Sequence, residues 1–119
     1  MKAGTFEDTC GWDKAYELVS EIHRITKDFP ESEKDGIAQQ MIEAAMSIPV
    51  AERYEREQGA EYGDYLAIAY NSLLYLETQY RLAVDLGYIN KNEVVENLLK
   101  EVGNMLCRMS VPAMLSALQ

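Results

Sequence analysis

Few residues in this chain are of a type and spacing that could carry out catalysis. His23 is the only histidine in the 119-residue chain. A di-iron or di-manganese site in a helical bundle uses a histidine three residues after a glutamate on each of two helices. Ser20 stands three residues before His23, and there is no second histidine. That kind of metal site is therefore excluded, and His23 is interpreted as a surface or boundary residue.

The carboxylates and serines give only weak indications of a chemical site. Glu43 and Glu77 leave a carboxylate-only cation site open, because carboxylates bind hard cations. Glu77 is either a polar anchor at a subunit interface or ligand groove, or a solvated residue that pairs with Arg81 four positions later. A serine nucleophile requires a positioned base, and none accompanies Ser47 or Ser72. The sequence therefore predicts no enzyme, no catalytic or metal-binding residues and no cofactor.

The remaining polar and aromatic residues are more typical of contacts than of chemistry. Five of the eight tyrosines fall between residues 62 and 80 without neighbouring lysines, which favours core or interface positions over stacking on bases. A glutamine at position 40 is expected to form a hydrogen bond across the bundle. The candidate interface or binding residues are Gln40, Tyr65, Tyr75, Glu77 and Tyr80.

The charge and cysteine content restrict the classes of partner. Twenty acidic and eleven basic residues give a formal net charge of −9, with most of the acids in residues 1–59. Such a balance favours solubility and opposes contact with phosphate backbones. Cys10 and Cys107 belong to no CxxC pair, so reduced thiols are the default, with a disulfide between them as an alternative. No signal peptide or membrane-spanning stretch is recognisable, so a cytoplasmic protein without membrane contact is expected.

Four segments carry the apolar spacing of amphipathic helices. The first covers residues 12–28 and ends before Pro30, because the residue preceding a proline is pushed out of the helical region. The second covers residues 32–58 and starts with a capping-box pattern at Ser32. Pro49 lies inside it, and the helix-forming residues that follow favour a kinked helix that continues.

The third segment, residues 62–86, holds more apolar residues than one helix face needs. One seam consists of Tyr62, Leu66, Ala69, Leu73, Leu76, Tyr80 and Ala83. A second seam beside it consists of Tyr65, Ile68, Ser72, Tyr75, Gln79, Leu82 and Leu86. A helix of a small monomeric bundle needs a single apolar stripe. The second seam therefore predicts burial against another subunit, and Gly87 predicts the end of the helix.

The fourth segment completes a helical domain. It begins at Asn90, interpreted as the N-cap, and ends or bends near Ser110 because of Pro112. Residues 1–10 are expected to form a loose arm and residues 111–119 an apolar tail that packs on something. Four helices, short connections and no strand pattern predict a single all-α domain over the whole chain, an antiparallel up-down-up-down four-helix bundle.

Several short motifs in this order resemble a known family. They are Phe29-Pro30, Gln40, Ala44-Ala45, Ser47-Ile48-Pro49, Leu66, Ile68-Ala69, Ser72-Leu73, Leu76-Glu77-Thr78 and Leu86-Gly87-Tyr88. Over about residues 14–110, the chain resembles the 23S ribosomal RNA intervening-sequence proteins and is similar to accessory subunits of diversity-generating retroelements. The resemblance implies a four-helix bundle, a ring-shaped homopentamer, no catalytic residues, and links to RNA or to reverse-transcription machinery.

The departures from the family pattern bear on function. Ile42 and Glu43 stand where the pattern has two arginines, and Tyr75 stands where it has a glutamate. The loss of these arginines argues against direct nucleic-acid binding. We therefore expect a non-enzymatic oligomeric scaffold that presents an acidic multivalent surface to a protein partner. The alternatives are an accessory protein associated with RNA or a reverse-transcriptase-like polymerase, and a bundle that binds a small molecule or metal.

Overall fold

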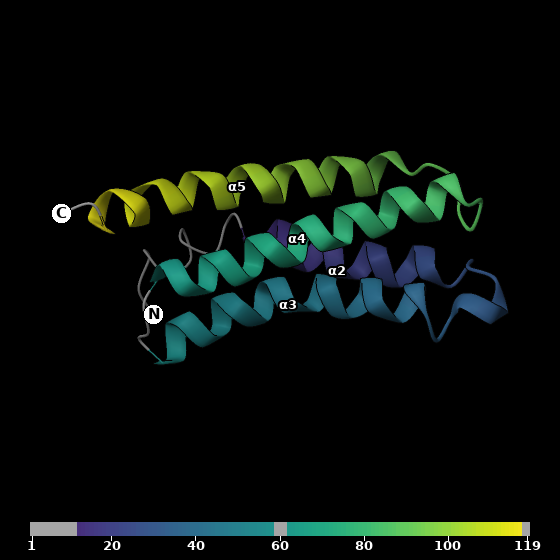
Figure 1. The fold of residues 1–119 in the computed structure, drawn as a ribbon, viewed down its shortest axis with the longest axis horizontal. Coiled ribbons are helices and arrows are strands. Elements are labelled where there is room, and N and C mark those ends of the chain that lie inside the picture. Colours follow the sequence, from purple (N-terminus) through teal and green to yellow (C-terminus); the bar gives the residue numbers. More distant parts are fainter. Residues whose placement is uncertain (1–11, 59–61, 118–119) are drawn as a thin grey trace.

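The structure, a computed structural model, describes residues 12–58 and 62–117, with side chains over 12–51 and 65–109. These residues form four α-helices and one short 3-10 helix, with no strand among them (Figure 1). The elements are α2 (Trp12–Thr26), η1 (Glu31–Glu33), α3 (Ile37–Gln58), α4 (Tyr62–Asp85) and α5 (Glu93–Ala117). The predicted all-α class with four helices is confirmed. The predicted arm over residues 1–10 lies outside the described residues.

The four long helices lie side by side, and each contacts two others. Helix α3 contacts α2 and α4, and α5 likewise contacts α2 and α4. Figure 1 shows the helices sharing one long direction. None of the helices in the described part combines the length and apolarity needed to cross a membrane.

The core contains apolar side chains from all four helices, and the first seam of α4 lies entirely within it. The described members of that seam are Leu66, Ala69, Leu73, Leu76, Tyr80 and Ala83, all buried. They belong to the same core cluster as Leu18 and Ile22 of α2, Met41 and Ile48 of α3, and Val95 and Val102 of α5, each fully buried. The first seam of α4 therefore faces the interior of the bundle.

Helix α2 ends at Thr26, two residues earlier than predicted. The N–H groups of Lys27, Asp28 and Phe29 each bond to a carbonyl three residues back, which tightens the chain into a turn before Pro30. Phe29 is buried, and its ring lies 5.9 Å from that of Tyr88, centroid to centroid. Two of the motifs that carry the family resemblance therefore meet at one end of the bundle.

The start of α3 differs from the prediction. The helix begins at Ile37, and Ser32 lies in η1 instead of capping α3. The reason is local, because the N–H of Glu33 bonds to the carbonyl of Pro30 at 2.9 Å in a 3-10 turn. The capping-box prediction was therefore wrong. The predicted continuation of the helix through Pro49 is confirmed, since α3 runs on to Gln58.

Helix α4 ends at a glycine in the left-handed conformation, as predicted. Gly87 has φ +79°, a value that residues with a Cβ rarely adopt. The N–H of Tyr88 bonds to the carbonyl of Ala83 at 2.9 Å, and that of Gly87 bonds to Val84 at 3.0 Å. These two bonds form a Schellman motif, which satisfies the last carbonyls of the helix.

Replacing Gly87 by alanine is expected to lower the free energy of unfolding by about 1 kcal/mol, measured by urea denaturation. No atom lies within 4 Å of the Cβ position, so the effect comes from the backbone conformation alone. Gly36→Ala is the matched control, because Gly36 has no positive φ and its new Cβ would make only ordinary contacts. Equal losses in the two variants would contradict this explanation.

The two ends of α5 also differ from the sequence prediction. The N-cap is Asn92, whose Oδ1 accepts the N–H of Val95 at 2.9 Å, rather than Asn90. Both asparagines suit an N-cap, and spacing alone did not separate them. Helix α5 continues to Ala117, so of the two predicted alternatives, an end or a bend near Ser110, the end is wrong, and residues 111–117 belong to the helix. A proline removes one backbone hydrogen bond, and here the helix continues without it.

Candidate functional site

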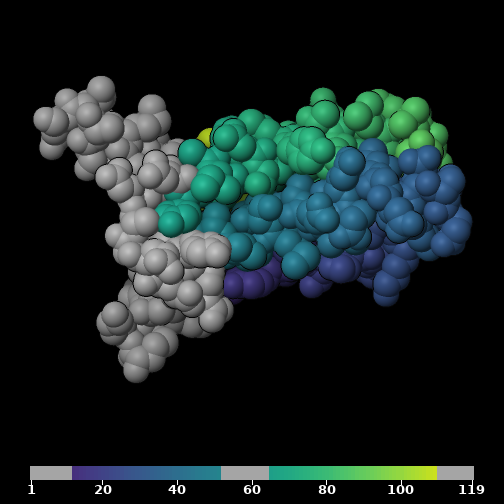
Figure 2. Space-filling view, turned by 60° about the horizontal axis from the view of Figure 1, so that its bottom comes forward, coloured from purple at the N-terminus to yellow at the C-terminus, as the bar shows by residue number. Residues whose placement is uncertain are grey.

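The solvent-facing side of α4 carries an exposed apolar stripe, which we call the α4 ridge. It consists of Ile68, Tyr75 and Leu82 on the helix and of Leu86 directly after it, with 50, 53, 47 and 60% of their surfaces exposed. All four belong to the second seam. Figure 2 shows α4 (teal to green) beside α3 (blue) on the surface of the molecule. Large apolar side chains repeated along one exposed face are typical of an interaction surface.

The same region of α4 is nearly free of charge. Between positions 65 and 84, the only charged residues are Glu77 and Arg81. The exposed side of α2, in contrast, carries Asp13, Glu17 and Arg24. Depletion of charged residues is the compositional property that distinguishes the centre of a protein interface from ordinary surface. The outer side of α4 therefore has both the apolar area and the low charge of a contact surface.

The five residues predicted as interface or binding positions fall in different environments. Tyr75 lies on the α4 ridge, and Glu77 is exposed on α4. Tyr65 is partly buried against the core, while Tyr80 is buried, with 3% of its surface exposed. Gln40 is exposed on α3. The structure therefore places only some of this set on an accessible surface.

Gln40 forms the cross-bundle hydrogen bond predicted from the sequence. Its Oε1 accepts a bond from Nε2 of Gln79 on α4 at 2.9 Å. Gln79 is 5% exposed, and its own Oε1 is buried with no partner among the described residues. The sequence missed Gln79, because nothing in the spacing of the second seam separates a buried glutamine from the exposed Tyr75. The amide pair ties α3 to α4 beside the ridge.

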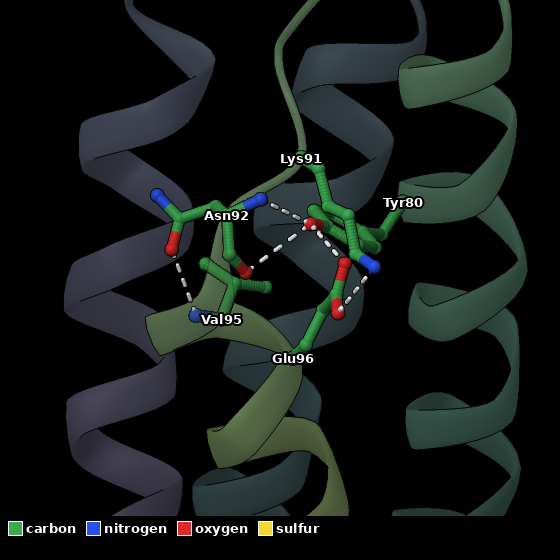
Figure 3. Close-up of polar contacts among 5 residues, drawn as sticks. All are labelled: Tyr80, Lys91, Asn92, Val95 and Glu96. Atoms are coloured by element: carbon green, nitrogen blue, oxygen red, sulfur yellow. Dashed lines mark hydrogen bonds and ion pairs between the residues drawn. The ribbon is translucent and has the colours of Figure 1, made fainter.

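Tyr80 is the centre of a polar network that joins α4 to the start of α5 (Figure 3). Its hydroxyl accepts the N–H of Asn92 at 2.7 Å and lies 3.0 Å from Oε2 of Glu96, to which it can donate. Lys91 Nζ lies 3.8 Å from the other oxygen of Glu96. The network therefore fixes the connection between the two helices, and the role of Tyr80 is internal to the chain.

Burial raises the pKa of the Tyr80 hydroxyl, because the charged phenolate would lose solvation. The bond from the Asn92 N–H lowers the pKa, and the hydrogen bond and charge of Glu96 raise it. The net direction is upward. Tyr80 therefore stays protonated, as its bond to a carboxylate requires.

A groove of about 660 Å³ runs between α4 and α5 next to this network. Its lining includes Glu77, Arg81 and Asp85 from α4, and Lys91, Glu96 and Lys100 near and on α5. Glu96 is paired with Lys91. No ion pair within 4.0 Å joins Glu77 to Arg81 in the described part of the chain. Glu77 is thus exposed to solvent at the edge of the groove and forms no ion pair with Arg81.

A smaller groove between α2 and α3 has apolar walls. Its lining residues are Tyr16, Val19, Met46, Pro49 and Val50, around a volume of about 300 Å³. Tyr16, Met46 and Val50 are each nearly half exposed. We call this surface the α2–α3 groove. The spacing of residues within each helix does not reveal this groove, because the groove forms only where α2 and α3 pack side by side.

The positions considered for metal chemistry are dispersed. His23 is exposed on α2, as interpreted from the sequence. Glu43 accepts a hydrogen bond from Gln39 at 3.2 Å on α3. Over the described residues, no three or more histidine, cysteine or acidic side chains are grouped so that they could hold a metal ion.

Comparison with known proteins identifies a family. Residues 7–108 match the family model described as 23S rRNA-intervening sequence protein. The matched range includes all of α2, α3 and α4 and most of α5. Comparison with curated proteins gave no match.

Proposed function

Because the chain belongs to the 23S rRNA-intervening sequence protein family, we propose that it is a non-enzymatic, cytoplasmic scaffold that works as a self-associated four-helix bundle. The observation that carries this proposal is the α4 ridge, since four half-exposed apolar side chains on a nearly uncharged face favour burial against another protein. The resemblance noted in the sequence favours a ring of five subunits.

The proposed subunit is an up-down-up-down antiparallel bundle. Contacts between α4 and α5 support this arrangement. The hydroxyl of Tyr80 accepts the N–H of Asn92, which lies at the start of α5. The hydroxyl of Tyr70, earlier in α4, lies 4.0 Å from Sγ of Cys107, later in α5. Residue numbers thus rise along one helix as they fall along the other. Short connections between the remaining helices favour the same alternation.

The proposed assembly would repeat one acidic surface several times. The chain has a formal net charge of −9, so a ring of subunits would multiply that charge on one particle. Such a particle suits a protein partner with a basic surface, because complementary potentials speed encounter and select partners.

Light scattering at micromolar concentration tests self-association. We expect a mass that is a multiple of the 13.5 kDa monomer, five-fold for the ring. Ile68→Asp should shift the protein toward smaller species, because it places a charge on the α4 ridge. Asn104→Asp is the control, since Asn104 is exposed on α5 away from the ridge. A monomeric wild-type protein would overturn the proposal.

A second candidate function is that of an accessory protein associated with RNA or a reverse-transcriptase-like polymerase. The observation in its favour is the α4–α5 groove, where Arg81, Lys91 and Lys100 gather in an otherwise acidic chain. Arg81 and Lys100 have no ion pair within 4.0 Å among the described residues, so both are available to phosphates. The three carboxylates in the same groove weaken this candidate.

Binding to RNA by this groove would fall steeply with salt, because each neutralised phosphate releases counterions. If the second candidate is correct, Arg81→Ala with Lys100→Ala should reduce affinity for single-stranded RNA in fluorescence anisotropy at low salt. Lys27→Ala is the control, since Lys27 lies in the turn after α2. Absence of salt-dependent RNA binding by the wild-type protein would eliminate the candidate.

A further inference from the structure

We propose that the α4–α5 groove binds a helical segment of the partner protein, one that carries opposite charges four residues apart. This inference rests on the proposed scaffold function, because it names the part of the subunit that receives the partner and the chemistry of the segment received. Its basis is that the two walls of the groove carry charges of alternating and mutually opposite sign on either side of an apolar floor.

Each wall of the groove alternates in charge. On the α4 wall the signs are negative, positive and negative, at Glu77, Arg81 and Asp85. On the α5 wall they are positive, negative and positive, at Lys91, Glu96 and Lys100. Residues four apart lie on one side of a helix, about 6 Å from each other along its axis. The groove is therefore bordered by two rows of regularly spaced charges.

The two rows face each other with opposite signs. The Tyr80 hydroxyl lies 3.0 Å from Oε2 of Glu96 (Figure 3), so Arg81, the next residue on α4, stands near the level of Glu96. Because α4 and α5 run in opposite directions past this contact, Glu77 falls near the level of Lys100, one turn further along. No ion pair within 4.0 Å crosses the groove between these described residues. The facing charges are thus open to a group placed between them.

The floor between the two rows is apolar and firmly held. Leu99 is buried, and Val84 is partly buried against the core. Tyr80 is also buried, and its hydroxyl accepts the N–H of Asn92, which ties α4 to the start of α5. A helix that docks in a groove places its apolar side on the floor, and its polar flanks then meet the walls. The groove has this layout, on elements whose relative position is already fixed.

The charge of the groove selects the class of occupant. Small-molecule pockets are lined mainly by hydrophobic side chains, whereas six of the ten lining residues here are charged. A nucleic acid brings only negative charge, which the three carboxylates of the groove would repel. A helix that alternates lysine or arginine with aspartate or glutamate every four residues presents both signs at the spacing of the walls. The net charge of −9 draws a basic partner to the subunit, and the groove decides which segment of it docks.

The groove and the α4 ridge use different sides of α4. Each residue turns an α-helix by about 100°, so Glu77 and Arg81 point roughly 160° and 120° away from Tyr75. Burial of the ridge against another subunit therefore leaves the groove accessible. A self-associated scaffold would present one such groove per subunit, and a partner with several matching segments would gain affinity from their linkage.

Binding of a designed peptide to the full chain tests the inference. The probe is a labelled alanine-based helical peptide with leucines along one side and, on each flank, lysine and glutamate alternating every four residues. The control peptide has the same composition, with all lysines on one flank and all glutamates on the other. In fluorescence anisotropy at low salt, the alternating peptide should bind about tenfold more tightly, because the control places like charges together on both walls.

Two variants separate the charge pattern of the groove from the total charge. Arg81→Glu should weaken binding of the alternating peptide about tenfold, whereas Lys27→Glu, which makes the same change in net charge in the turn after α2, should not. Glu77→Lys/Arg81→Glu keeps the net charge but inverts two signs of the α4 wall, and it should weaken binding as well. All these side chains are exposed, so the bundle should tolerate the changes. Circular dichroism checks folding, and Lys100→Glu replaces Arg81→Glu if that variant does not fold.

The inference is overturned if the wild type binds neither peptide or both equally, or if Arg81→Glu and Lys27→Glu lose the same affinity. It is also overturned if single-stranded RNA binds in the same assay, depends on Arg81, and displaces no alternating peptide. Light scattering keeps the proposed function apart from this result. An assembled wild type without peptide binding overturns the groove inference alone, whereas a monomeric wild type that binds the alternating peptide through Arg81 overturns self-association alone.

Discussion

Replacing Leu76 by alanine is expected to lower the free energy of unfolding by about 2–5 kcal/mol. Leu76 lies at the middle of the first seam of α4 with none of its surface exposed. Truncation removes buried methyl groups and leaves a cavity that the surrounding helices fill only in part. Urea denaturation followed by circular dichroism, at a fixed protein concentration, gives the difference from the wild type.

Leu82→Ala is the matched control, because Leu82 is the same residue type on the same helix but belongs to the α4 ridge. Its effect on unfolding of the subunit should stay within about 0.5 kcal/mol, as for other surface positions. It should instead reduce assembly in light scattering. If Leu82→Ala destabilised the subunit as much as Leu76→Ala does, the two seams of α4 would not have separate roles.

Replacing Tyr80 by phenylalanine is expected to lower the free energy of unfolding by about 1–3 kcal/mol. The change keeps the ring but removes the hydroxyl that accepts the Asn92 N–H and contacts Glu96. Both groups then lack this partner near the start of α5. Tyr75→Phe is the control, because Tyr75 is half exposed on the same helix. Removing its hydroxyl should leave the free energy of unfolding nearly unchanged. Equal effects in the two variants would contradict a specific role for the Tyr80 network.

The Tyr80 variant should also alter stability at alkaline pH. A tyrosine in the unfolded chain ionises near pH 10, whereas burial raises the pKa of Tyr80 in the fold. The stabilisation from Tyr80 is therefore complete below about pH 10 and is lost as the pH rises through the folded pKa. Between pH 8 and pH 10.5, the wild type should lose more stability than Tyr80→Phe. If the free energy of unfolding fell equally with pH in the two proteins, that would contradict a raised pKa of Tyr80 in the fold.

The sequence predicted the helices and their core faces well because burial follows simple spacing. In residues 90–110, heptad spacing predicts a stripe of Val95, Leu98, Val102, Met105 and Met109; the first four are buried and Met109 is partly buried. In α2, three- and four-residue spacing predicts a stripe of Trp12, Ala15, Val19, Ile22 and Thr26. Leu18 and Ile25 are buried as well, although they lie outside that stripe. A helix between two neighbours buries a wider face than one line of residues, and the position of those neighbours is tertiary information.

The helix ends were harder to predict, because several residues suit each end. Ser32 had the residue type of an N-cap, yet the chain after Pro30 forms a 3-10 turn and α3 starts at Ile37. Asn90 and Asn92 compete in the same way, and the buried hydroxyl of Tyr80 bonds to Asn92. Gly87 was predictable because a left-handed helix end strongly favours glycine. The α2–α3 groove could not be predicted, since it depends on how two helices pack side by side.

The order of the helices around the bundle has a consequence for folding. Three of the four principal contacts join consecutive helices, and only the α2–α5 contact joins elements far apart in sequence. Helical domains dominated by such local contacts fold within about microseconds to milliseconds. Two specific protein surfaces meet at roughly 10⁵–10⁷ M⁻¹ s⁻¹, which at about 1 μM is roughly 0.1–10 encounters per second. In the proposed assembly, each subunit therefore completes its fold before it meets a neighbour, and only the second of these steps depends on concentration.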